Sequence, residues 1–398
     1  MTSDTLIIDA DGDLVLSFDP EECSSTLTDD IWIDADSSED DSQIIDAEPS
    51  NTVSRILIKA TDVSPTDISI EEPSESNDNS WVELKQVRML VSSKHMSVAS
   101  PVFKAMFQAS SQEGIELKIT GKVELSLRDE DSKAWNILLN IIHGRFRSVP
   151  LDINLPMFTQ IALLCDKYQM HEVAYAFTPT WRMSAGHDSV SGEDIPRWIF
   201  IAWTFNMTDV LEEITKGLAL NYTGNGIEKI VQHDYSTDSS NCYGADTTFI
   251  DELENSRQHA IAELVDMFDY TIQRYQEDSS KCSIRTRCGE DRVSYRKQCD
   301  SMILGMLLKG AIEQQIYPLP KKPYKEWSFS ILEKKIKCIK PTSLCAAVSL
   351  IPDVHCDQDH GISKIMTSWI KHTAHEVTGL QLASLKRDAS PEIQWPIR

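Results

Sequence analysis

Residues 81–182 carry a succession of short apolar patterns that predict one small folded unit. Apolar and polar positions alternate over residues 87–91, a period of two that is typical of a half-buried strand. Helical spacing then predicts a short helix that turns Met96 and Ala99 inward. Ser100-Pro101, a capping serine followed by proline at the first helical position, begins a second helix with Phe103 on its apolar face.

The second part of this stretch predicts a pair of strands and two longer helices. Apolar residues alternate over residues 115–119 and 123–127, on either side of a Thr-Gly-Lys turn, which favours a hairpin or two edge strands. Apolar positions at i, i+3, i+4 and i+7 predict helices over residues 135–142 and 158–168. A small sheet with helices packed on it makes the predicted fold class α+β.

Two further regions flank this unit. Leu14, Leu16 and Phe18 alternate after an Asp-Gly-Asp turn and predict a strand within residues 1–18. Residues 190–388 show helical spacing, interrupted by polar loops near 223–250 and 278–290, and prolines between 318 and 323 stop the longest helix. The C-terminal region is therefore predicted to be all-α.

Four segments of the central unit, taken in order, resemble a known family: VRMLVSSKHMSVASPVFKAMF, VELSL, AWNILLNIIHGR and IALLCDKYQM. They are similar to the BTB/POZ domain, in the version common in filamentous fungi. The resemblance implies a BTB/POZ fold over residues 81–182, a small sheet capped by helices. It makes residues 1–18 the first strand region and residues 19–80 an acidic insertion. The segment LGMLLKGAIEQQIYPLPKKPY also resembles the helical region of such proteins, and it implies no activity.

The resemblance implies a protein-binding function with two activities. One is self-association as a homodimer, in which such domains bury the first helix and an exchanged N-terminal strand. In this chain those elements would supply Met96, Ala99 and Phe103 together with Leu14 and Leu16. Apolar residues of this kind also serve as ordinary core, and the sequence leaves both interpretations open.

The second implied activity is docking to a cullin, so that another region presents a substrate for ubiquitin transfer. Some family members contact the cullin through an apolar residue and an acidic residue that are separated by one residue of any type. Leu127-Arg128-Asp129 is the nearest match, which makes Leu127 and Asp129 the candidate cullin contacts.

The net charge of −24 is concentrated at one end of the 398-residue chain. Residues 1–80 hold 22 of the 62 acidic and 2 of the 38 basic residues, a net charge of −20, and the remaining residues together carry −4. The Asp, Glu, Ser and Pro content of residues 19–80 cannot bury enough apolar surface to offset ordering entropy, so we expect disorder there. Direct binding to nucleic acid needs a basic face and is not expected.

The apolar segments and the cysteines bear on where in the cell the protein is expected. No charged segment followed by an apolar core opens the chain, and the longest apolar run, near residues 344–351, is far below the roughly 18 residues needed to span a bilayer. We therefore expect a soluble, intracellular protein without a membrane partner, and nucleus and cytoplasm stay open. Nine scattered cysteines, an odd number, indicate reduced thiols.

The acidic segment contains one motif of its own, formed by Ile31, Trp32, Ile33 and Asp34 directly before a run of serines and acids. It resembles a motif that binds the small modifier SUMO by adding a strand to the partner's sheet, although short patterns of this kind also arise by chance. The motif supports an alternative function, an oligomerising transcriptional or chromatin cofactor that recruits partners through its acidic segment.

The second half contains a scattered set of metal-ligand residue types: Cys282, Cys288, Cys299, Cys338, Cys345, His355, Cys356 and His360. Structural zinc sites usually show a Cys-x2–4-Cys knuckle, which these spacings lack, so we predict neither a metal nor another cofactor and interpret Cys299 as a small core residue. No nucleophile elbow, P-loop, dinucleotide fingerprint or His-Glu-x-x-His motif is present. The sequence therefore predicts binding and no catalytic residues.

Overall fold

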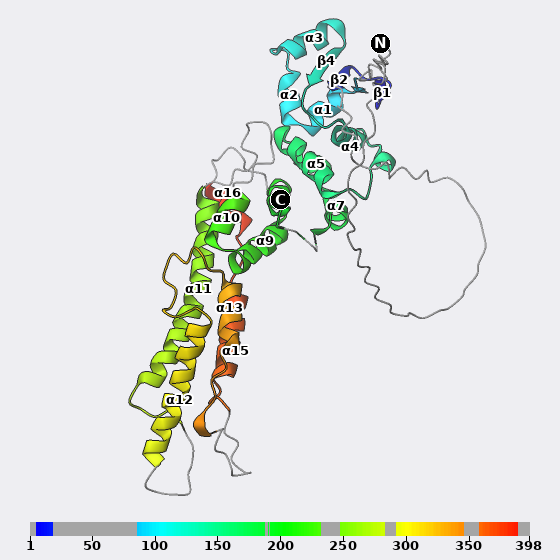
Figure 1. Cartoon of the computed structure of the whole chain (residues 1–398). Helices are drawn as coiled ribbons and strands as arrows, with labels where there is room; N and C mark the ends of the chain where they lie inside the picture. Colours follow the sequence, from blue (N-terminus) through cyan, green and yellow to red (C-terminus); the bar gives the residue numbers. More distant parts are fainter. Residues whose placement is uncertain are drawn as a thin grey trace, which may run out of the picture.

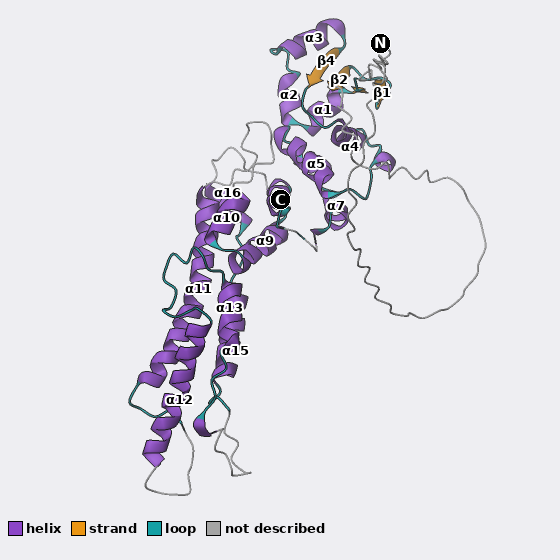
Figure 2. Cartoon of the chain, viewed as in Figure 1, coloured by secondary structure: helices purple, strands orange, loops and turns teal. Residues whose placement is uncertain are grey.

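A computed structural model of the chain describes residues 5–18, 86–187, 190, 192–231, 247–282, 292–345 and 358–388. It shows a unit that contains all the described strands, followed by an elongated bundle of helices (Figures 1 and 2). The predicted mixture of α and β structure is confirmed, since a small four-stranded sheet accompanies a mostly helical chain.

The sheet is built from distant parts of the sequence. Its strands are β1 (Thr5–Ile7), β2 (Leu14–Phe18), β3 (Arg88–Val91) and β4 (Val123–Leu127), in the order β1-β3-β2-β4. Strand β2 is antiparallel to β3 and parallel to β4, while β1 is parallel to β3. The strand predicted within residues 1–18 therefore occupies the interior of the sheet, and β1 and β4 form its edges.

Short helices pack on and beside the sheet, and the first five of them begin at a side chain that caps the helix. They are α1 (Ser93–Ala99), α2 (Pro101–Met106), α3 (Gln112–Thr120), α4 (Ser132–Ile142), α5 (Leu155–Lys167), α6 (His171–Ala174) and α7 (Thr178–Ser184). Buried Ser100 ends α1 and caps α2: its hydroxyl accepts the Phe103 amide at 3.1 Å and donates to the Tyr168 carbonyl at 2.6 Å. One serine thus fixes the corner between the first two helices and ties it to α5.

The hairpin or pair of edge strands predicted over residues 115–127 is wrong in its first half, where the chain forms α3 instead. Ser111 caps this helix by accepting the Gly114 amide at 3.0 Å, and Gly121 ends it at φ 71°, a left-handed conformation that suits glycine. Two of the alternating apolar residues face water, since Ile115 is 46% and Ile119 is 77% exposed, while Leu117 packs partly against the core. Local capping signals outweighed the two-residue alternation.

The C-terminal region is helical, as predicted. Its helices are α8 (Ile195–Thr204), α9 (Thr208–Asn221), α10 (Gly224–Val231), α11 (Thr247–Gln276), α12 (Arg292–Glu313), α13 (Phe329–Cys338), α15 (Ile362–Glu376) and α16 (Leu382–Asp388). The long helix α11 contacts α9, α12, α13 and α15 and forms the centre of the bundle (Figure 1).

The two regions join through helices α5 and α8. Phe158 of α5 is fully buried, and its ring lies 6.1 Å from that of Trp198 and 5.6 Å from that of Phe205. The helical region therefore packs on the sheet-containing unit through an aromatic junction.

Within the part of the chain that the structure describes, no helix combines the length and apolar character needed to cross a membrane.

Candidate functional site

The residues expected at a homodimer interface lie inside the single chain. Leu14, Leu16, Met96 and Phe103 are each 0% exposed, and Ala99 is half-buried. Strand β2 is paired on both sides and α1 turns Met96 into the core. Of the two interpretations that the sequence left open, the single chain adopts core packing for these four residues.

Exposed apolar side chains lie on the neighbouring elements instead. Leu6 and Ile7 of the edge strand β1 are 44% and 57% exposed, and Val98 of α1 is 90% exposed. An Asp9 carboxylate oxygen is 4.0 Å from Nδ1 of His95, one turn before Val98. The end of β1 therefore adjoins the outer face of α1.

The candidate cullin contacts differ in accessibility. Leu127 is buried and pairs with Phe18 in the sheet, so its side chain belongs to the core. Asp129 follows β4 in a left-handed turn at φ 62° and is exposed. Only the acidic member of the pair is available to a partner without rearrangement of the sheet. The candidate SUMO-binding residues, 31–34, lie outside the described residues.

A histidine and an arginine at the end of α4 hold the unit together. His143 Nε2 accepts the Ser92 amide at 3.1 Å, and its Nδ1 lies 2.9 Å from the Leu139 carbonyl. Burial lowers the pKa of His143, which favours the neutral ring that this arrangement needs. Arg145 donates to the carbonyl of Ile7 at 3.2 Å. Asp9, His95 and His143 lie close enough to suggest a metal site, but both ring nitrogens of His143 are already engaged.

Four of the scattered cysteine and histidine residues meet in the helical bundle, contrary to the expectation from their spacing. Cys282, Cys299, Cys345 and His360 place one ligand atom each within 4.8 Å of all the others. The Sγ atoms of Cys299 and Cys345 lie 3.5 and 3.2 Å from His360 Nε2. Cys338 is exposed and outside the cluster, and Cys288, His355 and Cys356 lie outside the described residues.

Each of the four comes from a different segment. Cys282 follows α11, Cys299 lies in the first turns of α12, Cys345 follows α13, and His360 directly precedes α15. The cysteines are at most 3% exposed, and Tyr295 and Leu344 pack against them. Burial raises the pKa of the Cys299 thiol to about 12, so without a cation this thiol stays neutral.

Asp300 organises the surroundings of the cluster. Its carboxylate accepts the amides of Lys281 and Cys282 at 2.7 and 3.0 Å and the Ser280 hydroxyl at 3.0 Å. The same carboxylate lies 3.9 Å from His360 Nδ1, the ring nitrogen that faces away from the cysteines. Asp300 therefore fixes the segment that carries Cys282 and lies beside the outer nitrogen of His360.

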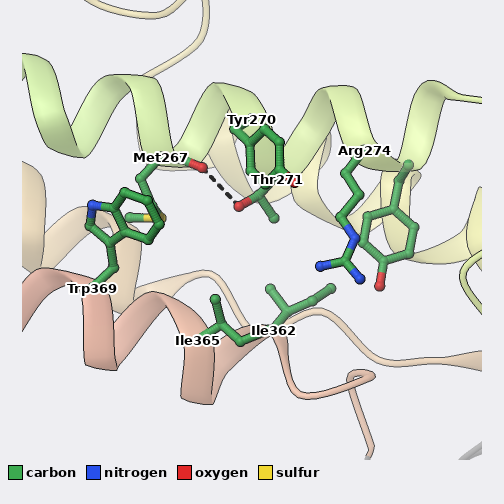
Figure 3. A pocket seen from close by; sticks show the side chains of 8 residues that line it. Met267, Tyr270, Thr271, Arg274, Ile362, Ile365 and Trp369 are labelled. Atoms are coloured by element: carbon green, nitrogen blue, oxygen red, sulfur yellow. Dashed lines mark hydrogen bonds between the residues drawn. The ribbon is translucent and has the colours of Figure 1, made fainter.

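A groove lies between α11 and α15 near this cluster (Figure 3). Its lining is mainly apolar: Met267, Tyr270, Thr271, Arg274, Tyr275, Ile362, Ile365 and Trp369. The Thr271 hydroxyl donates to the Met267 carbonyl at 2.8 Å within its own helix. The groove offers contact area and one cation, and no assembled catalytic group.

No protein-family model, no curated protein and no solved structure matches this chain.

Proposed function

We propose that this chain is a protein-binding scaffold that self-associates through its N-terminal sheet edge. The observation that supports it is the exposure of Leu6 and Ile7 on the edge strand β1, together with Val98 on the adjoining helix α1. The resemblance to the BTB/POZ domain points to the same kind of function.

A second copy of the chain is the partner that fits this edge. Edge strands present unpaired amides and carbonyls that another strand extends, and two copies of one edge pair antiparallel about a two-fold axis. Alternating charges would oppose such pairing, but residues 5–8 are Thr, Leu, Ile and Ile. The apolar side chains then add buried area across the axis.

Light scattering coupled to size-exclusion chromatography of the full chain tests this proposal. We expect a dimer for the wild type and a monomer for Ile7→Lys combined with Val98→Glu, because two charges would be desolvated at the interface. Met183→Lys is the matched control, since Met183 is 83% exposed on α7, away from β1, and should leave the dimer unchanged (Figure 1). A wild type that stays monomeric at every concentration would contradict the proposal.

As a finer proposal, the dimer serves as a substrate adaptor for a cullin-based ubiquitin ligase, with exposed Asp129 as the contact. We expect a purified cullin N-terminal region to shift the dimer to a larger complex, and Asp129→Lys to weaken it at least tenfold by placing a charge of opposite sign at the contact. Glu116→Lys, an equal charge change at an exposed position of α3, is the control. No shift at micromolar concentrations would exclude this role.

The alternative function, a transcriptional or chromatin cofactor, depends on the acidic segment and its candidate SUMO-binding motif, residues 31–34. These residues lie outside the described part of the chain, so this alternative is supported by the sequence alone. The exposed sheet edge favours self-association equally under both functions.

A further inference from the structure

We propose that Cys282, Cys299, Cys345 and His360 form a structural Zn²⁺ site of the three-cysteine, one-histidine type. Three thiolates and one imidazole are a ligand set that zinc takes in structural sites. The proposal rests on the assembly of these side chains and is independent of the self-association at the sheet edge.

The distances match the edges of a coordination tetrahedron. Zinc bonds of about 2.3 Å to sulfur and about 2.05 Å to nitrogen place a sulfur about 3.6 Å from the nitrogen and two sulfurs about 3.8 Å apart. The observed Sγ to Nε2 separations are 3.5 Å for Cys299 and 3.2 Å for Cys345, and all four ligand atoms lie within 4.8 Å of one another. The upper bound of 4.8 Å exceeds these edges by about 1 Å at most, a difference that side-chain rotations can close around the ion.

The surroundings meet the further requirements of a metal site. A ligating histidine almost always offers its other ring nitrogen to a carboxylate, carbonyl or water. Here the Tyr275 hydroxyl and the Asp300 carboxylate lie 3.4 and 3.9 Å from His360 Nδ1. Tyr295 and Leu344 pack on the cysteines and shield their thiolates from water. Four protein ligands leave no open position, so the site is structural rather than catalytic.

The ion would add one common link to segments that hydrogen bonds already hold close, among them those from Asp300 to the amides of Lys281 and Cys282. Its ligands extend over residues 282–360 and tie the ends of α11, α12, α13 and α15 at one point of the bundle (Figure 1). A link across so long a stretch restricts the unfolded chain, and binding energy of structural zinc adds directly to folding. We infer that zinc stabilises this end of the helical bundle and with it the neighbouring α11–α15 groove.

The alternative to zinc binding is a disulfide between two of the three cysteines. Only the third thiol and the histidine would then remain to bind a metal ion. A thiolate cluster that instead held iron would also differ from zinc in its absorption spectrum. Metal analysis and thiol counting distinguish these outcomes in one sample.

The test is elemental analysis of the full-length protein, purified without chelators. We expect about one zinc per chain, little iron, and X-ray absorption that fits three sulfur atoms at about 2.3 Å and one nitrogen at about 2.05 Å. Cys299→Ser and His360→Ala should each lose most of the zinc. Cys338→Ser, at an exposed cysteine outside the cluster, should retain it.

Two measurements keep the test decisive if the ligand variants fail to fold. Adding a strong chelator to the wild type should lower its melting temperature, and restoring equimolar Zn²⁺ should recover it. Asp300→Asn keeps every ligand and should weaken zinc binding roughly 10- to 100-fold in competition with a chromophoric chelator. Zinc below about a tenth of an equivalent after reconstitution, iron in its place, or a disulfide among the three cysteines would overturn the proposal.

Discussion

Replacing Arg257 by methionine is expected to lower the free energy of unfolding by about 3–5 kcal/mol. Arg257 is fully buried in α11, and its guanidinium donates to the carbonyls of Pro323, Tyr324 and Trp327 at 3.1, 3.0 and 2.7 Å. Its Nε also donates to the Glu254 carboxylate at 2.7 Å. Methionine fills much of the same volume but donates nothing, so three carbonyls and one carboxylate lose a partner.

The sequence explains why an arginine is needed at this position. The connection between α12 and α13 contains three prolines, which have no amide hydrogen to pair with nearby carbonyls. Arg257 provides its guanidinium donors from a neighbouring helix and thereby holds the connection on α11. A single buried cation replaces the hydrogen bonds that regular structure would otherwise have made.

Urea denaturation followed by circular dichroism measures this effect. Arg274→Met is the matched control, because Arg274 lies exposed on the same helix and its loss should change stability by no more than about 0.5 kcal/mol. Adding Glu254→Gln to Arg257→Met should recover part of the loss, since the unpaired carboxylate is removed. A loss below about 1 kcal/mol would show that the carbonyls find other partners.

Patterns confined to a few residues predicted the local elements well. The alternation of Leu14, Leu16 and Phe18 gave a strand because one face of that segment is buried, and the helical spacing from Trp135 gave α4. The strand predicted over residues 115–119 is wrong because apolar alternation indicates a strand only where one face is buried. Here Ile115 and Ile119 face water. Capping by Ser111 was the better signal.

The cysteine cluster shows why the candidate metal site escaped prediction. A zinc knuckle is visible in a sequence because one short turn supplies two ligands. Here Cys282, Cys299, Cys345 and His360 each come from a separate segment, and the packing of α11, α12, α13 and α15 brings them together. Tertiary structure, which spacing does not encode, determines this site. The signal that the sequence offered was the concentration of cysteine and histidine residues between positions 282 and 360.

The interface residues illustrate a different limit. Met96 and Phe103 are apolar, and both a core and a homodimer interface select such residues. The sequence therefore predicted correctly that these side chains are buried, but it did not show whether the same chain or a second copy buries them. Only the structure, in which Phe103 packs against Trp135 and Tyr168 and Met96 is 0% exposed, shows that the single chain itself buries them.

Replacing Phe158 by alanine is expected to lower the free energy of unfolding by about 3–5 kcal/mol. The Phe158 ring is 0% exposed and contacts three aromatic rings, with centroid distances of 6.0 Å to Trp181, 6.1 Å to Trp198 and 5.6 Å to Phe205. Alanine leaves a cavity that these large side chains cannot fill, and it removes the edge-on and stacked contacts, each of which contributes about 0.5–1.5 kcal/mol.

Because Phe158 lies at the junction of α5 and α8, its loss should also loosen the link between the two regions. Differential scanning calorimetry should show the unfolding transition of the variant shifted to lower temperature and broadened or split, as the sheet-containing unit and the helical bundle begin to unfold independently. Tyr175→Ala, at an aromatic residue that is 71% exposed in the same unit, should leave the transition in place. A variant that keeps one sharp transition with a loss below about 1 kcal/mol would show that the aromatic junction does not couple the regions.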